Sequence, residues 1–355
     1  MTLPVLTAHA ERARAALPAA VHEFMASGAG DEVTLAESAA AWSSFRLLPR
    51  VLRDVGVVDL TTELLGDAFA SPVGIAPAGY AGLVRDEAEV AVADGARRSG
   101  SLYVVSTRAS RPLEEVAAAV GGPWWFQVYM MRDRGLTRGL VERAVAAGAR
   151  ALVLTGDTPV VGIKRRVGAA RIDIPDDSFL VNLARHLSPG DALAPRAAAE
   201  QDPTATLDAI GWLRELSVLP VLVKGVLRPD DAAACLDAGA AGVVVSNHGG
   251  RQLDRSLPAA LALAGVVDAA AGRGPVLVDG GVRSGLDALV ALALGAQGVL
   301  VGRPVVWGLA ADGADGVAAA LAAVRDDLAH VMALAGASTP ADLDRSLVVP
   351  PPGSR

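Results

Sequence analysis

The sequence predicts an α/β protein: a (β/α)8 TIM barrel with an N-terminal helical lead-in and a long lid loop after the fourth strand. From residue 72 onward, short β-branched runs alternate with Ala- and Leu-rich stretches whose apolar residues recur at helical spacing. About eight such units occupy ~250 residues, the size of one barrel of this kind. Aromatic residues make up only 4% of the chain. Ala, Val and Leu must therefore fill the core, and such small side chains suit repeated close packing of helices on strands.

Eight runs are predicted as strands because each is brief and almost continuously apolar, as expected for strands buried on both faces of a parallel sheet. They are residues 72–76, 102–106, 125–129, 151–155, 220–224, 242–246, 275–279 and 298–302. Helices are predicted between them over 87–98, 136–147, 229–238 and 284–294. A doubly wound open sheet is the alternative, but the segment PAGYAGL after the first strand matches the dinucleotide-binding glycine pattern poorly.

Two segments fall outside the repeat, although residues 1–355 are expected to form one domain. Residues 1–71 are predicted as helices followed by an extended lead-in that packs on the barrel (72–336), and 337–355 form a C-terminal tail. The connection 156–203 is too long for an ordinary loop. Its Pro, Asp and Ser content predicts a cover over the carboxyl end of the barrel, where active sites of this fold lie. A merely disordered insertion is the alternative.

Composition excludes several classes of protein. The single Cys excludes an internal disulfide and sites built on several thiolates; Cys235 is expected as a small buried residue within a helix. The net charge of -7 argues against nonspecific nucleic-acid binding, and 52% hydrophobic residues argue against disorder. Charges interrupt the N-terminal segment where a signal peptide needs an apolar core, and no run of ~20 apolar residues is present. We therefore expect a soluble cytoplasmic protein with no metal site and no nucleic-acid or membrane partner.

Polar side chains gather at the predicted strand ends, which have no packing reason to collect them. They are Ser106, Gln127, Tyr129, Thr155, Asp157, Lys224, Ser246, Asn247, His248, Asp279 and Arg303. Caps and turns explain any one of these residues as well as catalysis does. They explain the whole set poorly, because the carboxyl ends of the strands meet on the face where barrels of this fold carry out their chemistry.

The sharpest single signal is the segment SNHGGRQLD, residues 246–254. His248 titrates near neutral pH and suits proton transfer. Gly249 and Gly250 permit close approach of the backbone, and Arg251 offers a planar fork for a carboxylate. Asp157, at another strand end, is positioned to orient His248 and to stabilise its protonated form. A catalytic role for His248 is favoured over a purely structural one.

A second signal predicts a phosphate site. The segments DGGVRSG (279–285) and VGRP (301–304) place adjacent glycines at helix starts, with Arg283 and Arg303 alongside. Backbone N–H groups at the seventh and eighth strands of a barrel bind phosphate in this way. Lys224, at the end of the fifth strand, adds a cation suited to stabilising negative charge on a cofactor ring.

These motifs resemble the FMN-dependent 2-hydroxy-acid oxidase/dehydrogenase family, typified by glycolate oxidase, lactate oxidase and mandelate-type enzymes. The resemblance runs from about residue 17 to residue 342. Its most specific part is SNHGGRQLD; ASGAGDEVTL, IAP, FQVY, LTGDTP, LVKGV, DGGVRSG and GVLVGRP support it. The resemblance implies FMN-dependent oxidation of an (S)-2-hydroxy acid to a 2-oxo acid, with oxygen as the electron acceptor, and a homotetramer.

Carried over to matching positions, the resemblance implies that His248 is the base and Asp157 its carboxylate partner. Arg251 would bind the substrate carboxylate, the Tyr129 hydroxyl would contact the substrate, and Lys224 would stabilise the reduced anionic flavin. The implied FMN-binding set is Ala76, Pro77, Ala78, Gly79, Ser106, Gln127, Thr155, Lys224, Ser246, Asp279, Gly281, Arg283, Gly302 and Arg303.

The sequence departs from the family pattern at four places around the implied substrate site. Phe24 stands where the family usually has Tyr. The family commonly has an Arg after DTP; here Lys164 aligns with it without a gap, and Arg165 is one residue later. Arg108 stands at a position that is often aromatic. Gly79 replaces the Ala of many oxidases, which leaves room near the implied flavin N5 and bears on the monooxygenase branch, in which the oxo acid is decarboxylated.

We hypothesise from these departures that Arg108 and Lys164 accept a bulkier or doubly anionic substrate in place of glycolate. A specialised biosynthetic oxidase acting on an aryl hydroxy acid is an equal alternative. Outside this family, a flavin-dependent isomerase of the isopentenyl diphosphate type would share the phosphate site but has no need for His248 and Arg251. A non-catalytic barrel that binds FMN or an anionic metabolite is the non-enzyme alternative.

Overall fold

The computed structural model describes residues 2–166, 172, 174–175, 178–179, 181–183 and 195–351. Eight parallel strands form its central sheet, and each lies within or overlaps one of the eight predicted runs. They are β4 (Val73–Ile75), β5 (Val104–Val105), β6 (Trp125–Val128), β7 (Ala151–Thr155), β8 (Val221–Val226), β9 (Gly242–Val245), β10 (Val276–Asp279) and β11 (Gly298–Val301). The order is β4-β11-β10-β9-β8-β7-β6-β5, and a parallel bridge between Ile75 and Tyr103 joins its two edges. The predicted (β/α)8 barrel is confirmed.

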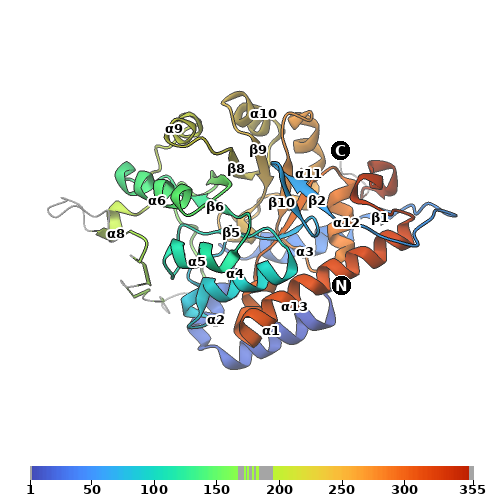
Figure 1. The fold of residues 1–355 in the computed structure, drawn as a ribbon, viewed down its shortest axis with the longest axis horizontal. Helices are drawn as coiled ribbons and strands as arrows, with labels where there is room; N and C mark the ends of the chain where they lie inside the picture. Colours follow the sequence, from blue (N-terminus) through green and yellow to red (C-terminus); the bar gives the residue numbers. More distant parts are fainter. Residues whose placement is uncertain are drawn as a thin grey trace.

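Helices surround the barrel (Figure 1), and all but the last of them connect successive strands. They are α4 (Ala88–Ser99), α5 (Leu113–Val120), α6 (Arg134–Ala146), α9 (Asp208–Leu216), α10 (Pro229–Asp237), α11 (Ala259–Ala270), α12 (Gly285–Ala293) and α13 (Arg303–Ala335). The four predicted helices correspond to α4, α6, α10 and α12. Cys235 is buried within α10 as expected, and burial raises the pKa of its thiol to about 11. Among the described helices, none is long and apolar enough to span a bilayer.

Alternation along the strands divides the buried side chains into two sets. Val104 and Trp125 point into the barrel, whereas their neighbours Val105 and Phe126 pack against the helices. The interior set is Leu64, Phe69, Ala76, Leu102, Val104, Trp125, Ala151, Val153, Leu222, Val244, Leu277 and Leu300. Aliphatic residues dominate it, so the barrel is packed through its length and its site lies at one end.

The lead-in packs against the barrel, as the sequence predicts. It contains α1 (Pro4–Ala16), α2 (Ala19–Ala26), α3 (Val33–Ser43), β1 (Arg46–Leu47) and an antiparallel hairpin of β2 (Thr62–Leu64) and β3 (Asp67–Phe69). Helix α1 lies along α13 (Figure 1). Leu64 and Phe69 of the hairpin join the interior set. Strand β1 pairs with β12 (Val348–Val349), which ties the lead-in to the C-terminal segment.

The predicted lid, 156–203, lies partly outside the described residues. Its described parts include the short helix α8 (Pro195–Ala198) and a bridge between Met131 and Gln201. The Asn182 amide donates to the carbonyls of Ala109 and Arg111, and its Oδ1 accepts from Leu113 N at 3.0 Å. The described part of the lid is thus bonded to the loop that follows β5.

Candidate active site

A cavity that opens to solvent lies at the carboxyl ends of the strands. The strand-end residues and α2 form its walls, so positions far apart in the chain meet there. Predicted site residues that line it are Phe24, Ala76, Pro77, Ala78, Gly79, Ser106, Arg108, Tyr129, Lys224, His248, Arg251, Asp279, Gly281, Arg283, Gly302 and Arg303. This convergence is what a ligand site at the active face of a barrel requires.

His248 and Asp157 form a hydrogen-bonded pair at the cavity wall. His248 Nδ1 lies 3.0 Å from Asp157 Oδ1, and the Thr158 hydroxyl donates to the same carboxylate oxygen at 3.2 Å. Burial raises the pKa of Asp157, but His248, Lys224 and Thr158 together bring this pKa below its ordinary value. The carboxylate is therefore ionised and holds the Nδ1 side of the imidazole, which leaves Nε2 as the atom able to take up a proton.

The turn that carries His248 depends on glycine. His248, Gly249 and Gly250 all adopt positive φ angles, of 57°, 62° and 73°. A Cβ at Gly250 would lie 2.8 Å from the backbone nitrogen of Leu35, so α3 packs where a side chain would otherwise be. Ser246 Oγ accepts a hydrogen bond from the backbone nitrogen of His248 at 3.0 Å. The left-handed turn is thus fixed from both sides.

Lys224 places a positive charge in the cavity wall. Only 3% of the residue is exposed; its Nζ lies 3.0 Å from Asp279 Oδ2 and donates to Ser246 Oγ at 2.9 Å. Asp279 Oδ1, in contrast, is buried without a hydrogen-bond partner among the described residues. Because buried polar atoms are normally bonded, this free acceptor indicates that the site is completed by a ligand or by water.

A row of polar side chains crosses the ends of β5, β6 and β7. The Ser106 hydroxyl donates to Gln127 Oε1 at 3.2 Å, and Gln127 Nε2 donates to the Thr155 hydroxyl at 2.9 Å. Ser106 lines the cavity, Gln127 lies behind it, and Thr155 lines an adjoining cavity that shares Tyr129 and Lys224 with the first. The row therefore presents hydrogen-bonding groups along one wall.

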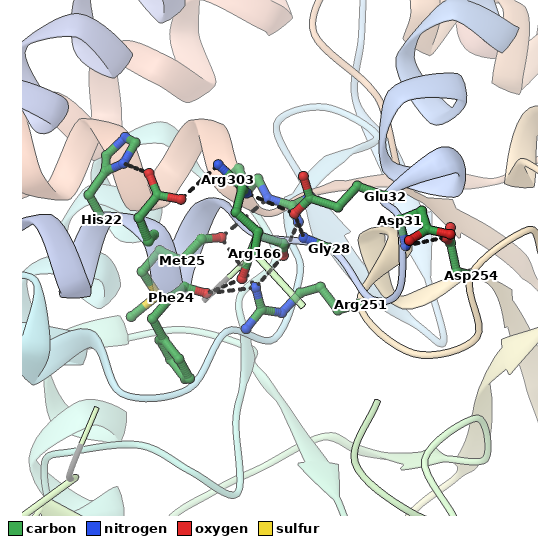
Figure 2. A network of polar contacts seen from close by, with 12 residues as sticks. His22, Phe24, Met25, Gly28, Asp31, Glu32, Arg166, Arg251, Asp254 and Arg303 are labelled. Atoms are coloured by element: carbon green, nitrogen blue, oxygen red, sulfur yellow. Dashed lines mark hydrogen bonds and ion pairs between the residues drawn. The ribbon is translucent and has the colours of Figure 1, made fainter. Parts of the chain in front are cut away.

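Three arginines lie close together in the cavity lining: Arg251, Arg283 and Arg303. Figure 2 shows Arg251 reaching the carbonyl oxygen of Phe24, at 2.8 Å. Arg303 donates to the carbonyls of Ser27 and Gly249. Within the described part of the chain, none of the three forms an ion pair.

Carbonyl oxygens are their direct partners, while the Asp287 and Glu32 carboxylates act on Arg283 and Arg303 only from a greater distance. Desolvation, followed by repulsion from Arg251 and Arg283, lowers the pKa of Arg303 to about 9. Such a cluster of cations is a binding site for an anion, because a bound anion would restore its charge balance.

Phe24, Tyr80, Arg108 and Tyr129 surround the remaining part of the cavity. The Phe24 and Tyr80 rings lie 6.2 Å apart, and the Arg251 guanidinium lies 5.4 Å from the Phe24 ring centroid. The Arg108 guanidinium lies 6.0 Å from the Tyr129 ring centroid. Burial raises the pKa of Tyr129 to about 12, although the Arg108 cation opposes this shift. The Tyr129 hydroxyl is therefore a neutral hydrogen-bond donor at neutral pH.

The structure does not bring Lys164 or Arg165 to the cavity lining. Lys164 is half-buried and its Nζ donates to the Gly162 carbonyl at 3.3 Å. Burial and the Arg251 charge lower the pKa of Lys164 to about 8. The Arg165 side chain is 66% exposed and pairs with Asp31. Of the cations predicted for substrate binding, Arg108 and Arg251 are the two that line the cavity.

The space expected beside Gly79 is also filled. A Cβ at Gly79 would lie 2.6 Å from the Cβ of Arg108, so the missing methyl group makes room for the Arg108 loop. Tyr80 and Thr158 are site residues that were not predicted from the sequence. Each directly follows a predicted site residue, Gly79 or Asp157, and this adjacency at a strand end is the signal that could have identified them.

Comparison with known proteins gives similarities over nearly the whole chain. Residues 13–350 match the family described as FMN-dependent dehydrogenase. L-lactate oxidase of Nostoc sp. is 44% identical over 338 residues, covering 92% of each chain. Glycolate oxidase of Spinacia oleracea is 41% identical over 340 residues, covering 94% of this chain and 92% of its own. A solved structure of mandelate oxidase with (S)-4-hydroxymandelic acid superposes with a TM-score of 0.89 at 40% identity, covering 97% and 98% of the two chains.

Proposed function

Because the chain belongs to the family of FMN-dependent 2-hydroxy-acid oxidases, we propose that it oxidises an (S)-2-hydroxy acid to a 2-oxo acid, with His248 as the base. The enzyme is an oxidoreductase acting on a CH–OH group, and its cofactor is FMN. The observation that carries the proposal is the 3.0 Å pair of His248 and Asp157 in the wall of a cavity that Arg251 and Lys224 also line.

The residues present fit FMN. The anion site of Arg283 and Arg303 suits its phosphate, and the backbone at Gly302 leaves that side open, since an added Cβ would meet nothing closer than the Ala76 Cβ at 3.9 Å. Lys224 and the free Asp279 Oδ1 offer a cation and an acceptor to a polar ring edge. Ser106 adds a hydroxyl on the neighbouring wall. When bound, FMN accepts the two electrons that the substrate loses.

The protein residues supply binding and proton transfer. Arg251 would bind the substrate carboxylate through its guanidinium fork, and the neutral Tyr129 hydroxyl would donate to the substrate. His248 Nε2 would take a proton from the substrate, and the ionised Asp157 would stabilise the resulting imidazolium. Phe24 offers an apolar ring where a tyrosine would offer a hydroxyl. Arg251 therefore carries more of the carboxylate binding in this enzyme.

We further propose oxygen as the electron acceptor, in keeping with the relatives that are named oxidases. Anaerobic mixing of the holoenzyme with a panel of hydroxy acids tests both steps. We expect at least one hydroxy acid to bleach the flavin absorbance with formation of the 2-oxo acid, and oxygen to restore the absorbance with formation of hydrogen peroxide. If no hydroxy acid bleaches the flavin, the proposal is wrong, and a non-catalytic barrel that binds FMN becomes the better interpretation.

A cytoplasmic location and a homotetramer also stay proposals. The location rests on the sequence, and the homotetramer rests on the family resemblance alone. Cell fractionation and light scattering of the purified holoenzyme test them.

A further inference from the structure

Arg108 is a buried cation in the active-site cavity, and no acidic side chain of the described residues pairs with it. Only 8% of it is exposed, yet it lines the cavity with His248 and Arg251. Its Nη2 donates to the Ala199 carbonyl, whereas Nη1 is buried with no hydrogen-bond partner in the part of the chain that the structure describes. It forms no ion pair with the described residues. Leaving a guanidinium N–H without a partner is costly, so this atom requires an explanation.

The surrounding residues hold Arg108 firmly in place. Its backbone nitrogen donates to Ser106 Oγ at 3.1 Å, and its carbonyl accepts from Tyr80 N at 2.8 Å. The guanidinium lies 4.6 Å from the ring centroid of Phe179, a described residue of the lid. Gly79 leaves the space that the Arg108 Cβ enters. The unused N–H is therefore preorganised, which is how a recognition group binds with little loss of entropy.

The charges of the cavity lining can be matched one by one. Lys224 pairs with Asp279, the only acidic side chain among the described residues that line the cavity. The phosphate of FMN would neutralise Arg283 and Arg303, and the substrate 2-hydroxy carboxylate would neutralise Arg251. One cation, Arg108, is left over. A cofactor and a monocarboxylate substrate together do not satisfy it.

We propose that Arg108 binds a second carboxylate of the substrate, so that the enzyme acts on 2-hydroxy dicarboxylic acids. This inference rests on the proposed function, because it assumes that Arg251 holds the first carboxylate. Arg108 and Arg251 line the same cavity, each beside a different ring of the aromatic wall formed by Phe24, Tyr80 and Tyr129: the Arg108 guanidinium lies 6.0 Å from the Tyr129 ring centroid and that of Arg251 lies 5.4 Å from the Phe24 ring centroid. A substrate with an anion at each end would span that aromatic wall while its hydroxyl-bearing carbon faces His248.

The test compares a diacid with a neutral analogue of the same shape. We would measure kcat/KM of the holoenzyme for (S)-malate and (S)-2-hydroxyglutarate, and for the corresponding compounds in which a carboxamide replaces the distal carboxylate. The variants are Arg108→Met, Arg108→Lys and, as a control, Arg111→Met. Arg111 is an exposed residue of the same loop whose side chain pairs with Glu115. Turnover of the monocarboxylates glycolate, lactate and mandelate is measured alongside, to show whether the oxidase reaction itself operates.

We expect the wild type to prefer at least one diacid over its amide by more than tenfold, since hydrogen bonds to charged groups are worth about that or more. Arg108→Met should remove this preference, Arg108→Lys should restore part of it, and Arg111→Met should leave it unchanged. Titration with the product-like 2-oxo diacid, followed by the flavin spectrum, should show the same ranking without turnover. This binding measurement also shows that each variant is folded and loaded with FMN.

Three outcomes would overturn the inference. If Arg108→Met lowers kcat/KM for the diacid and the amide equally, Arg108 only anchors the lid through Ala199 and Phe179. If the wild type oxidises glycolate, lactate or mandelate but shows no preference for a diacid, Arg108 does not select a second carboxylate. If no hydroxy acid of any kind reduces the flavin, the proposed function itself fails, and this inference fails with it.

Discussion

The backbone of Gly225 lies directly against the side chain of Asp157: a Cβ at residue 225 would come within 2.5 Å of the Asp157 Cβ and Cγ. Gly225 has a φ of 105° and stands where the pairing of β8 with β9 shifts register, between Lys224 and Val226. This irregularity sets the carboxylate that holds His248 beside the strand that supplies Lys224. Gly225 thereby helps to position the carboxylate that holds the proposed base.

Gly225→Ala should therefore impair turnover by displacing Asp157. A displacement of about 1 Å in a catalytic arrangement costs about 100-fold in rate, so we expect kcat to fall by that order while FMN binding persists. Gly148→Ala is the matched control: Gly148 also has a positive φ, of 89°, but open space around the added Cβ. Equal losses in the two variants would show that backbone strain alone, and not the Asp157 contact, causes the effect.

His248→Gln should abolish most of the anaerobic flavin reduction. Positioned proton transfer contributes about 10²- to 10⁴-fold to a rate, and the variant should lose that factor in stopped-flow reduction with the preferred hydroxy acid. His330→Gln, on the outer helix α13 and exposed, should leave the rate unaltered. Retention of rapid reduction in His248→Gln would refute the assignment of the base.

Arg303→Met should weaken FMN binding by about 10- to 100-fold, the range expected for loss of hydrogen bonds to a charged phosphate. Inorganic phosphate should raise the melting temperature of FMN-free wild-type protein, because an anion relieves the repulsion among Arg251, Arg283 and Arg303. That increase should vanish in Arg303→Met and persist in Arg325→Met, whose guanidinium pairs with Asp326. Phosphate stabilisation that survives in Arg303→Met would place the anion site elsewhere.

Lys164 should make the free energy of unfolding depend on pH in alkaline solution. Burial, with the Arg251 charge, lowers the pKa of Lys164 from 10.5 to about 8. Between these two values the unfolded chain binds more protons than the folded one, so this residue makes stability rise with pH there. Below about pH 8 Lys164 is charged in both the folded and the unfolded chain, so the full cost of burying its charge lowers the free energy of unfolding.

Lys164→Met should therefore be more resistant to urea than the wild type at pH 7, with a smaller difference at pH 10. Arg165→Met, an exposed neighbour, should show no such change with pH. A difference between Lys164→Met and wild type that is the same at both pH values would contradict the lowered pKa.

The barrel and most of the candidate site are predictable from local patterns in the chain. A parallel strand buried on both faces is a nearly continuous apolar run. Segments such as 151–155 and 242–246 therefore predict strands without reference to the rest of the chain. Strand-end polarity is equally local, which is why His248, Lys224 and Asp279 were predicted from their positions. The closure of the barrel then brings these residues to one face.

Long-range packing, in contrast, sets which cations reach the cavity and which side chains occupy the space beside the glycines. From the sequence, Lys164, Arg165 and Arg108 were equally good candidates for a substrate-binding cation. Packing turns Arg165 towards Asp31 and encloses Arg108 between the cavity and Phe179. Likewise, the partners of Gly79 and Gly225 lie 29 and 68 residues away in sequence, at Arg108 and Asp157. Such contacts depend on the distance between chain segments after folding, which local periodicity and composition do not encode.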